Sequence, residues 1–465
     1  MPPKLDTTQI AQAGAASSLA PKIGEDDNNG NVSNTITSSS FHSWSVNVDD
    51  GIICEIFSRL PVKSLMRFKC LSKHWCSVIQ KDQHFIDLHF LQSKARTNLL
   101  LTVPRERNGY IQSWSVDDNL YPFRYFLAIA DLFSEGGEVP SVVHTTTREI
   151  DTGSYSITKP VNGLICLFDS EENLGVRVCN LSTRQVTTWI RSTFLSNFDL
   201  KDKGAHYLMS SRCNLGFDPA TKEHKVICMW TVRGGPVCEV LTLGDRTWRI
   251  IDDVLPAYNY TNSYTYGDSI YVNGFIYYEP QMIKFSFEDD KPIVIVAFDV
   301  GKEKFRAIEI PDFILDQISD SNRLSTVQLL EIDRHPALSS GTSRDIFKIW
   351  LFDDEYSNGC RTNTWTAVTV ELPVNLVYPD GNKVQSDRFS VRFHSVTGTG
   401  FIILYLYCWY RMWLGFEFAP QVSTYSYNLR TKIFTEIKIK GLPSGPHLKF
   451  VPCISTFTES LLPVQ

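Results

Sequence analysis

Hydrophobic positions between about Val46 and Gln92 recur at helical intervals. Asp49 or Asp50 can cap a first helix, and Pro61 ends it. The apolar residues of this helix share one face: Ile52, Ile53, Ile56, Phe57 and Leu60. The pattern therefore predicts an amphipathic helix that must cover its apolar face with another element.

Further short helices follow the first. The second is expected to hold Leu65, Phe68 and Leu71; Ser72 can cap a third with Trp75, Val78 and Ile79; and Asp82 opens a turn with Phe85 and Leu88. Isolated helices of this length are marginal in water because their nucleation is costly. So small a segment cannot bury all its apolar residues, which predicts an exposed interaction surface.

From about Thr97 onward, helical periodicity is nearly absent, and short β-branched and aromatic runs alternate with turn residues. These runs predict strands, for example Val161–Phe168, Val226–Trp230, Ser269–Tyr278, Ile293–Phe298, Ile346–Phe352 and Phe401–Tyr410. An imperfect repeat joins several of them: an Asn or Asp turn, a small residue, a charged residue and then an aromatic residue. Strong copies begin at Asn180, Asp299 and Asn428, and weaker copies at Asp218 and Leu243.

A second repeated piece stands upstream of two strong copies. It reads Asn-Gly before an apolar run, in Val161–Leu167 and Val272–Tyr278, with Gly400–Leu406 as a looser third copy. Asn-Gly between apolar runs is a strong signal for a β-hairpin. Small sheets that cannot cover both faces alone favour radial stacking, so residues 97–460 are predicted to form a β-propeller whose blade number stays open.

Composition narrows the choice of partners. Residues 1–44 are mainly small and polar, which predicts a disordered tail. The net charge of -6 lacks the basic excess of nucleic-acid-binding proteins. The 11 cysteines include no CxxC pair, so neither a disulfide framework nor a zinc site is predicted, and a reducing compartment fits best. We expect protein or small-molecule partners.

The apolar stretch Phe401–Tyr410 is too short to span a bilayer and is followed by Arg411, so we interpret it as a buried strand. No apolar signal run precedes Ser43, and the first arginine is Arg59, which argues against a transit peptide. The protein is therefore expected in the cytoplasm or nucleus, away from membranes.

Signals for catalysis are weak. Ser269 lies in a Gly-Asp-Ser sequence similar to the nucleophile signature of a hydrolase family, but its Tyr-rich context favours a turn. The histidines, including His84 and His89, show no metal-ligand spacing. Tryptophans could fill blade cores or, in a lectin-like propeller, stack on sugars: Trp230, Trp248, Trp365, Trp409 and Trp413. We expect no catalytic residue, cofactor or metal, and a propeller-type binding protein, lectin-like or other, is one of the functions that the sequence leaves open.

Residues 45–92 resemble an F-box, through Glu55–Leu65, Arg67–Ile79 and His84-Phe85. The later region resembles the kelch-like F-box-associated domain of plant F-box proteins, through Val161–Leu167, Gly216–Val226 and Ile295–Phe305. One departure is Val48-Asp49 in place of the family's Leu-Pro. Another is Gly51, because glycine in a helix costs about 1 kcal/mol relative to alanine. Both departures predict weaker docking.

The resemblance implies a substrate receptor of a Skp, cullin and F-box ubiquitin ligase. The F-box is then expected to dock on a Skp-type adaptor, and through it on cullin and RING subunits, while the β domain captures a protein target for ubiquitination. The residues that the resemblance places at the adaptor are Ile52, Ile56, Leu60, Pro61, Leu65, Arg67, Leu71, Lys73 and Trp75. For Ile56, Leu60 and Trp75, a purely structural role in the helical core is an equal alternative.

Overall fold

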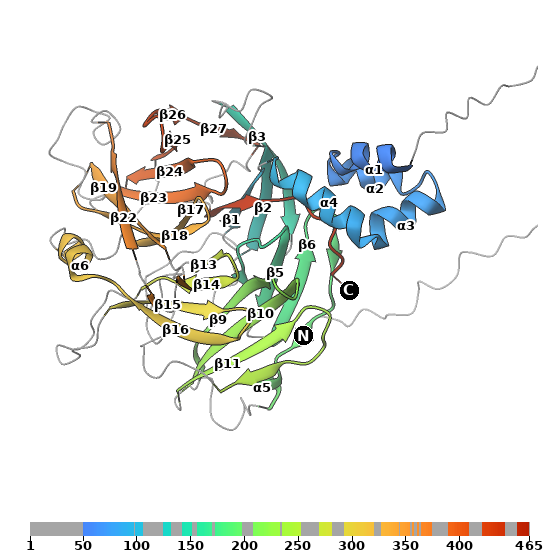
Figure 1. Ribbon diagram of the computed structural model, residues 1–465, viewed down its shortest axis with the longest axis horizontal. Coiled ribbons are helices and arrows are strands. Elements are labelled where there is room, and N and C mark those ends of the chain that lie inside the picture. Colours follow the sequence, from blue (N-terminus) through green and yellow to red (C-terminus); the bar gives the residue numbers. More distant parts are fainter. Residues whose placement is uncertain are drawn as a thin grey trace, which may run out of the picture. The chain divides into compact units, whose positions relative to one another are not determined.

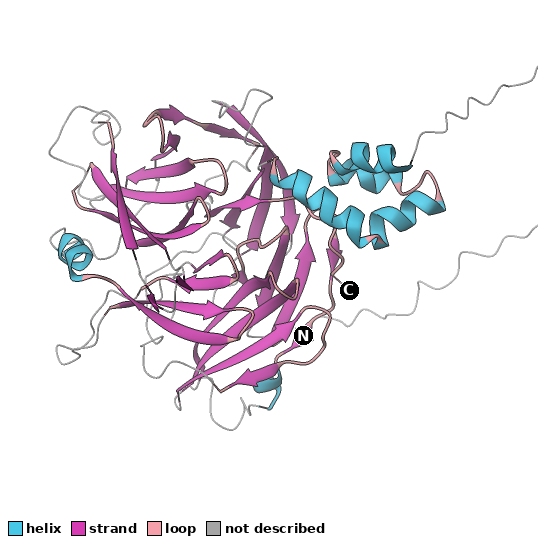
Figure 2. Cartoon of the chain, viewed as in Figure 1, coloured by secondary structure: helices cyan, strands magenta, loops and turns pink. Residues whose placement is uncertain are grey.

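The computed structural model describes residues 50–464, apart from gaps at 97, 106–123, 132–141, 151–155, 170–172, 198–207, 233–234, 253–268, 281–292, 320–326, 344, 354–355, 358–359, 362–363, 374–388, 409–420 and 442–452. The tail predicted at residues 1–44 lies outside the described residues. So do Val48-Asp49, Trp409 and Trp413. Helices gather before the first strand, and strands make up most of the rest (Figure 2).

Four helices form the first described part of the chain (Figure 1): α1 (Asp50–Ser58), α2 (Val62–Phe68), α3 (Lys73–Lys81) and α4 (Gln83–Lys94). Two of the predicted caps are confirmed. Ser72 accepts a hydrogen bond from the Trp75 backbone amide at 3.2 Å, and Asp82 accepts one from the Phe85 amide at 3.2 Å. These side chains satisfy amides that a helix leaves unpaired at its N-terminus.

The helices share one small core. Val62 and Leu65 of α2, Ile79 of α3, and Phe85 and Ile86 of α4 are buried together. A chain of rings extends this core toward α1, because Phe57 stacks on Phe68 with ring centroids 5.0 Å apart and meets Trp75 at 4.9 Å. Tertiary packing of this kind stabilises helices that are too short to persist alone.

The strands form six sheets of four or five strands and one two-stranded ribbon within the described ranges. The first sheet runs β27 (Lys438–Lys440), β3 (Val142–Ile150), β2 (Arg124–Asp131), β1 (Asn98–Arg105), β28 (Cys453–Phe457). The second holds β4 (Ser156–Ile157), β5 (Leu164–Asp169), β6 (Gly175–Asn180) and β7 (Gln185–Val186), with β8 (Ile190–Arg191) also paired to β6. The third holds β9 (Leu208–Asp218), β10 (Glu223–Val232), β11 (Gly235–Thr242) and β12 (Arg249–Ile251).

All strand pairs in the remaining sheets are antiparallel. The fourth holds β13 (Ser269–Val272), β14 (Phe275–Tyr278), β15 (Val294–Asp299) and β16 (Lys304–Glu309). The fifth holds β17 (Gln328–Ile332), β18 (His335–Gly341), β19 (Ile346–Asp353) and β22 (Thr364–Glu371), and the ribbon is β20 (Tyr356–Ser357) with β21 (Cys360–Arg361). The sixth holds β23 (Phe389–Val396), β24 (Phe401–Cys408), β25 (Gln421–Asn428) and β26 (Phe434–Glu436).

Buried clusters between neighbouring sheets close the six sheets into a ring. Each cluster draws residues from two successive sheets, and Ile403 of the sixth sheet packs with Leu101 of the first. Strand β28 also pairs with β1, with Leu100 opposite Ser455, so segments far apart in the chain share one sheet. The described strands therefore form a six-bladed β-propeller, which confirms the predicted fold and supplies the blade number.

Alternation along the strands explains why they are apolar on both sides. In β10, Val226 and Cys228 face the second sheet, whereas Ile227 and Met229 face the fourth. Successive side chains of a strand point to opposite faces, and both faces of a blade are covered by its neighbours. The predicted strand at Phe401–Tyr410 behaves in the same way: β24 is buried from Ile402 to Leu406. Within the described chain, we find no helix of the length and apolarity that crossing a membrane requires.

The two repeated motifs of the sequence are turns. Both residues of each Asn-Gly pair have positive φ, 50° and 81° at Asn162-Gly163 and 47° and 89° at Asn273-Gly274, as a tight two-residue hairpin requires. In four of the five copies of the second motif, the Asn or Asp is followed four residues later by a residue of positive φ: Arg184 (66°), Lys222 (59°), Glu303 (56°) and Lys432 (60°). The copy at Leu243 differs, because its positive φ is at Gly244 (104°). The opening side chain accepts backbone hydrogen bonds inside the turn, as at Asn180 and Asn428.

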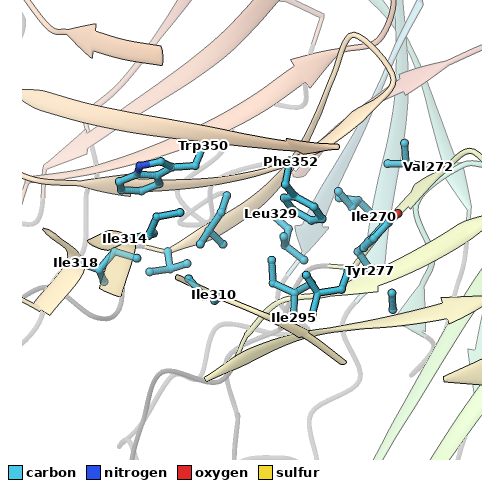
Figure 3. Close-up of a cluster of buried hydrophobic side chains, with 14 residues drawn as sticks. Ile270, Val272, Tyr277, Ile295, Ile310, Ile314, Ile318, Leu329, Trp350 and Phe352 are labelled. Carbon is cyan, nitrogen blue, oxygen red and sulfur yellow. The ribbon is translucent and has the colours of Figure 1, made fainter. Parts of the chain in front are cut away.

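Two helices interrupt the strands, although the sequence showed almost no helical periodicity there. They are α5 (Thr193–Asn197) and α6 (Asp312–Ser319). Ile314 and Ile318 of α6 are fully buried, in a cluster with Trp350 and Phe352 of β19 and Ile295 of β15 (Figure 3). A helix of so few residues leaves little periodic signal and is stabilised by this packing.

Candidate functional site

Exposed apolar side chains are concentrated in the helical segment. Among the described residues, eight large apolar side chains are exposed, and four of them lie on or beside α1 to α4: Ile52, Ile56, Leu71 and Leu91. The other four are spread over the much longer propeller at Val186, Ile250, Phe313 and Ile433. Exposed apolar side chains that are concentrated on a small domain commonly mark a site of protein association.

Three of these side chains make up what we call the apolar F-box face: Ile52, Ile56 and Leu71. Ile52 and Ile56 are one turn apart on α1, with 56% and 53% of their surface exposed. Leu71, 65% exposed, directly precedes the cap of α3. Two contacts connect α1 with α3. Phe57 packs against Trp75, and Nε2 of His74 lies 3.4 Å from Oδ2 of Asp50.

The structure distributes the predicted adaptor residues between surface and core. Besides the apolar F-box face, Pro61, Arg67 and Lys73 are exposed. Leu60 and Trp75 are half-buried, and both touch the helical core through one side. Leu65 is fully buried in that core, so in this structure it supports the surface and offers no side-chain area to a partner. The departure at Gly51 lies inside α1, in its first turn.

The helical core includes residues from the other end of the chain, which the sequence did not indicate. Helix α2 has Pro61 at its N-cap position and no side-chain cap of its own. Glu459 replaces the missing cap, because its Oε2 accepts a hydrogen bond from the Val62 amide at 3.1 Å. Leu461 is buried among Val62, Leu65 and Ile79. We call residues 458–464 the clamp segment.

The clamp segment is also attached to the second blade of the propeller. The buried Asn180 donates hydrogen bonds from Nδ2 to the carbonyl oxygens of Ser460 at 3.0 Å and Leu462 at 2.9 Å. Gly163 leaves room for the segment, since a Cβ there would lie 2.5 Å from the backbone carbonyl oxygen of Thr458. The same few residues thus pack against both the F-box and the propeller.

His89 makes the F-box sensitive to acid. It is fully buried, and its Nε2 donates to the Leu60 carbonyl oxygen at 3.0 Å. Burial lowers the pKa of His89 from 6.5 to about 4. The folded protein therefore binds fewer protons than the unfolded chain between these values, so stability is complete above about pH 6.5 and falls as pH drops toward 4.

We expect the free energy of unfolding to decrease by about 2 to 3 kcal/mol per such histidine between pH 7 and pH 4.5. His224 of the propeller, whose pKa burial also lowers to about 4, provides the matched comparison. Urea unfolding at both pH values should show that His89→Gln and His224→Gln each reduce this difference. An unchanged difference in His89→Gln would show that another group senses the acid.

The geometry favours neither a serine hydrolase that uses Ser269 nor a sugar-binding propeller. The Ser269 hydroxyl donates to Oδ1 of Asn214, an amide oxygen that does not act as a general base. Trp230 and Trp248 are buried in the cluster between the second and third sheets, and Trp365 packs against Phe352. Trp230 and Trp248 thus fill a blade core, and Trp365, which is half-buried, packs against the core between the fourth and fifth sheets.

Comparison with known proteins identifies the family. The F-box domain family matches residues 47–87, and the F-box associated beta propeller domain matches residues 126–459. The helical module is thus an F-box, and the chain is an F-box protein. Because the second match spans more than half of it, the chain belongs to the F-box proteins that carry an F-box-associated β-propeller.

Relatives in Arabidopsis thaliana align with this chain over most of their length. F-box protein At5g65850 is 28% identical over 413 residues, which cover 87% of this chain and 88% of the relative. F-box protein DOR is 27% identical over 408 residues, covering 84% and 87% of the two chains. Among solved structures, the β-propeller domain of the Trilobed protease from Pyrococcus furiosus aligns with 9% identity and a TM-score of 0.30, over 74% of this chain and 80% of that one. That structural likeness is too weak to bear on function.

Proposed function

We propose that this protein is the substrate-recognition subunit of a Skp, cullin and F-box ubiquitin ligase. The observation that carries the proposal is the apolar F-box face, an exposed apolar surface on a module whose family matches the F-box. In this role Ile52, Ile56 and Leu71 bind a Skp-type adaptor. Exposed Arg67 and Lys73 lie at the rim of the contact, where charges guide association more than they add affinity.

In the proposed ligase, the propeller captures the protein target. Bond formation then belongs to the other subunits of the ligase, and this chain supplies proximity by raising the effective concentration of the target near the ubiquitin-carrying enzyme. It needs no catalytic residue of its own for this function. Such a subunit works in the cytoplasm or the nucleus.

The proposal is tested by reconstitution. The full chain, co-expressed with a plant Skp-type adaptor, is expected to elute from size-exclusion chromatography as a stoichiometric complex. Adding cullin and RING subunits with ubiquitin, its activating enzyme and its conjugating enzyme is expected to give ubiquitin conjugates that depend on the full chain. Failure to associate with the adaptor at micromolar concentrations would refute the proposal.

A further inference from the structure

A cavity lies where the inner strands of the propeller meet. Its walls include residues of β9, β13, β17, β23 and β28 and of the turn between β4 and β5, so every blade contributes. We call this cavity the central channel. Its volume of about 590 Å³ falls within the range of small-molecule sites, roughly 300 to 1,000 Å³.

The described lining of the channel is basic, whereas the chain as a whole is acidic. Four basic side chains are among the described residues that line it, Lys94, Lys159, Arg334 and Arg392, against one acidic side chain, Glu331. The whole protein carries a net charge of -6. A concave site with one sign of charge and poorly polarisable walls concentrates ions of the other sign.

The one carboxylate among the described lining residues leaves three more basic than acidic side chains. Glu331 accepts a hydrogen bond from the Thr397 hydroxyl at 3.0 Å, and burial raises the pKa of its carboxyl group. The cations, in contrast, influence one another. The pKa of Lys94 is lowered by burial and, secondarily, by the positive charge of Arg334. An anion placed between these cations would relieve that repulsion.

The wall that carries Arg392 is held in a defined position. Val391 and Phe393 point into the cluster between the fifth and sixth sheets, so alternation along β23 directs Arg392 to the channel. Gln328 fixes the backbone on both sides of Arg392. Its side-chain amide donates from Nε2 to the Val391 carbonyl oxygen at 2.9 Å, and its Oε1 accepts from the Phe393 backbone amide at 2.9 Å.

Arg334 is held at its turn by a similar contact. The Asn273 side chain donates from Nδ2 to the Arg334 carbonyl oxygen at 2.8 Å and so links the turns of the fourth and fifth blades. Arg334 itself is exposed and has a positive φ of 67°. Cationic groups that are positioned before a ligand arrives lose less entropy when it binds.

We propose that the central channel binds a small polyanion, a molecule with at least two phosphate or carboxylate groups, through Arg392, Lys159, Arg334 and Lys94. The volume favours a compact molecule over a folded segment of a partner. This site is separate from the apolar F-box face and does not depend on the proposed ligase function. It assigns a ligand class to the propeller, for which the family match specifies none.

The test is a calorimetric titration of the full chain with inorganic pyrophosphate and with citrate, in low salt. We expect saturable binding with a stoichiometry of one, weakened as salt rises because screening reduces electrostatic attraction. The double variant Lys159→Gln/Arg392→Gln is expected to bind about tenfold more weakly or worse. The matched control, Lys304→Gln/Arg246→Gln, removes the same charges from exposed positions outside the channel lining and should bind as the parent does.

Folding is checked in parallel by circular dichroism and thermal unfolding. If the double variant unfolds, Arg334→Gln replaces it, because that side chain is exposed and its loss should still weaken binding. No saturable binding, or equal weakening in the control, overturns the proposal. A short poly-glutamate peptide is titrated as well: if it binds much more tightly than pyrophosphate and responds to the same variants, the channel takes acidic segments of protein targets, and the small-molecule proposal fails.

Discussion

Replacing Ile52 and Ile56 together with aspartate is expected to weaken binding of the Skp-type adaptor by about 100-fold or more. Both side chains lie on one face of α1, and each exposes more than half of its surface in the free protein. Burying two carboxylates in an apolar contact costs far more than the lost contact area alone. Because neither side chain belongs to the helical core, thermal stability should change little. Titration calorimetry with the purified adaptor measures the effect.

The control for this experiment is Phe313→Asp/Ile433→Asp. These side chains are also exposed, at 52% and 60%, but they lie on α6 and beside β26 in the propeller. The double control adds the same two charges and removes comparable apolar surface, so it should leave adaptor affinity within about twofold. Equal affinities of the two double variants would mean that the adaptor binds another surface.

The second large effect concerns the clamp segment. Leu461→Ala should lower the free energy of unfolding by about 2 to 5 kcal/mol, because it opens a cavity among fully packed side chains. Leu461 is 4% exposed and contacts the cluster of Val62, Leu65 and Phe85, so the loss should be concentrated in the F-box. Urea unfolding measures the total, and amide hydrogen exchange shows whether α2 and α4 lose protection first.

Leu91→Ala serves as the matched control, since it is the same substitution at a side chain that is 63% exposed on α4. It should change stability by no more than about 0.5 kcal/mol. If both variants unfold at the same denaturant concentration, the clamp segment contributes nothing to the F-box core. Protection lost only in propeller strands would likewise contradict the assignment of Leu461 to that core.

Local features of this chain could be predicted from the sequence. Ser72 and Asp82 could be predicted as N-caps. Each is a short side chain that can accept a hydrogen bond, and each directly precedes apolar residues at helical spacing. The Asn-Gly pairs predict tight hairpins because both residues tolerate positive φ. The repeats predicted the propeller and the family resemblance supported it, and the structure confirms it. The resemblance also predicted the F-box, which the family match confirms. The adaptor contacts themselves remain a prediction, with the qualification that Leu65 is buried.

Features that depend on distant residues could not be predicted. The Val62 amide and the Glu459 carboxylate are 397 positions apart, and no local pattern relates them. Leu461 lies just beyond the predicted propeller boundary at residue 460, yet it packs in the helical core. The blade number could not be predicted for the same reason, because ring closure depends on the pairing of β28 with the distant β1. The basic lining of the central channel comes from residues of the second, fifth and sixth blades and from α4.

The position of β28 and the clamp segment has a consequence for biosynthesis. A ribosome delivers the F-box helices and β1 long before it delivers Cys453–Phe457 and Leu461. Until those residues emerge, the first blade lacks one strand, the ring stays open, and α2 lacks the Glu459 cap. A nascent chain therefore cannot complete either module in advance of the other, and transcripts that stop short of residue 453 would yield a protein with both the helical module and the propeller incomplete.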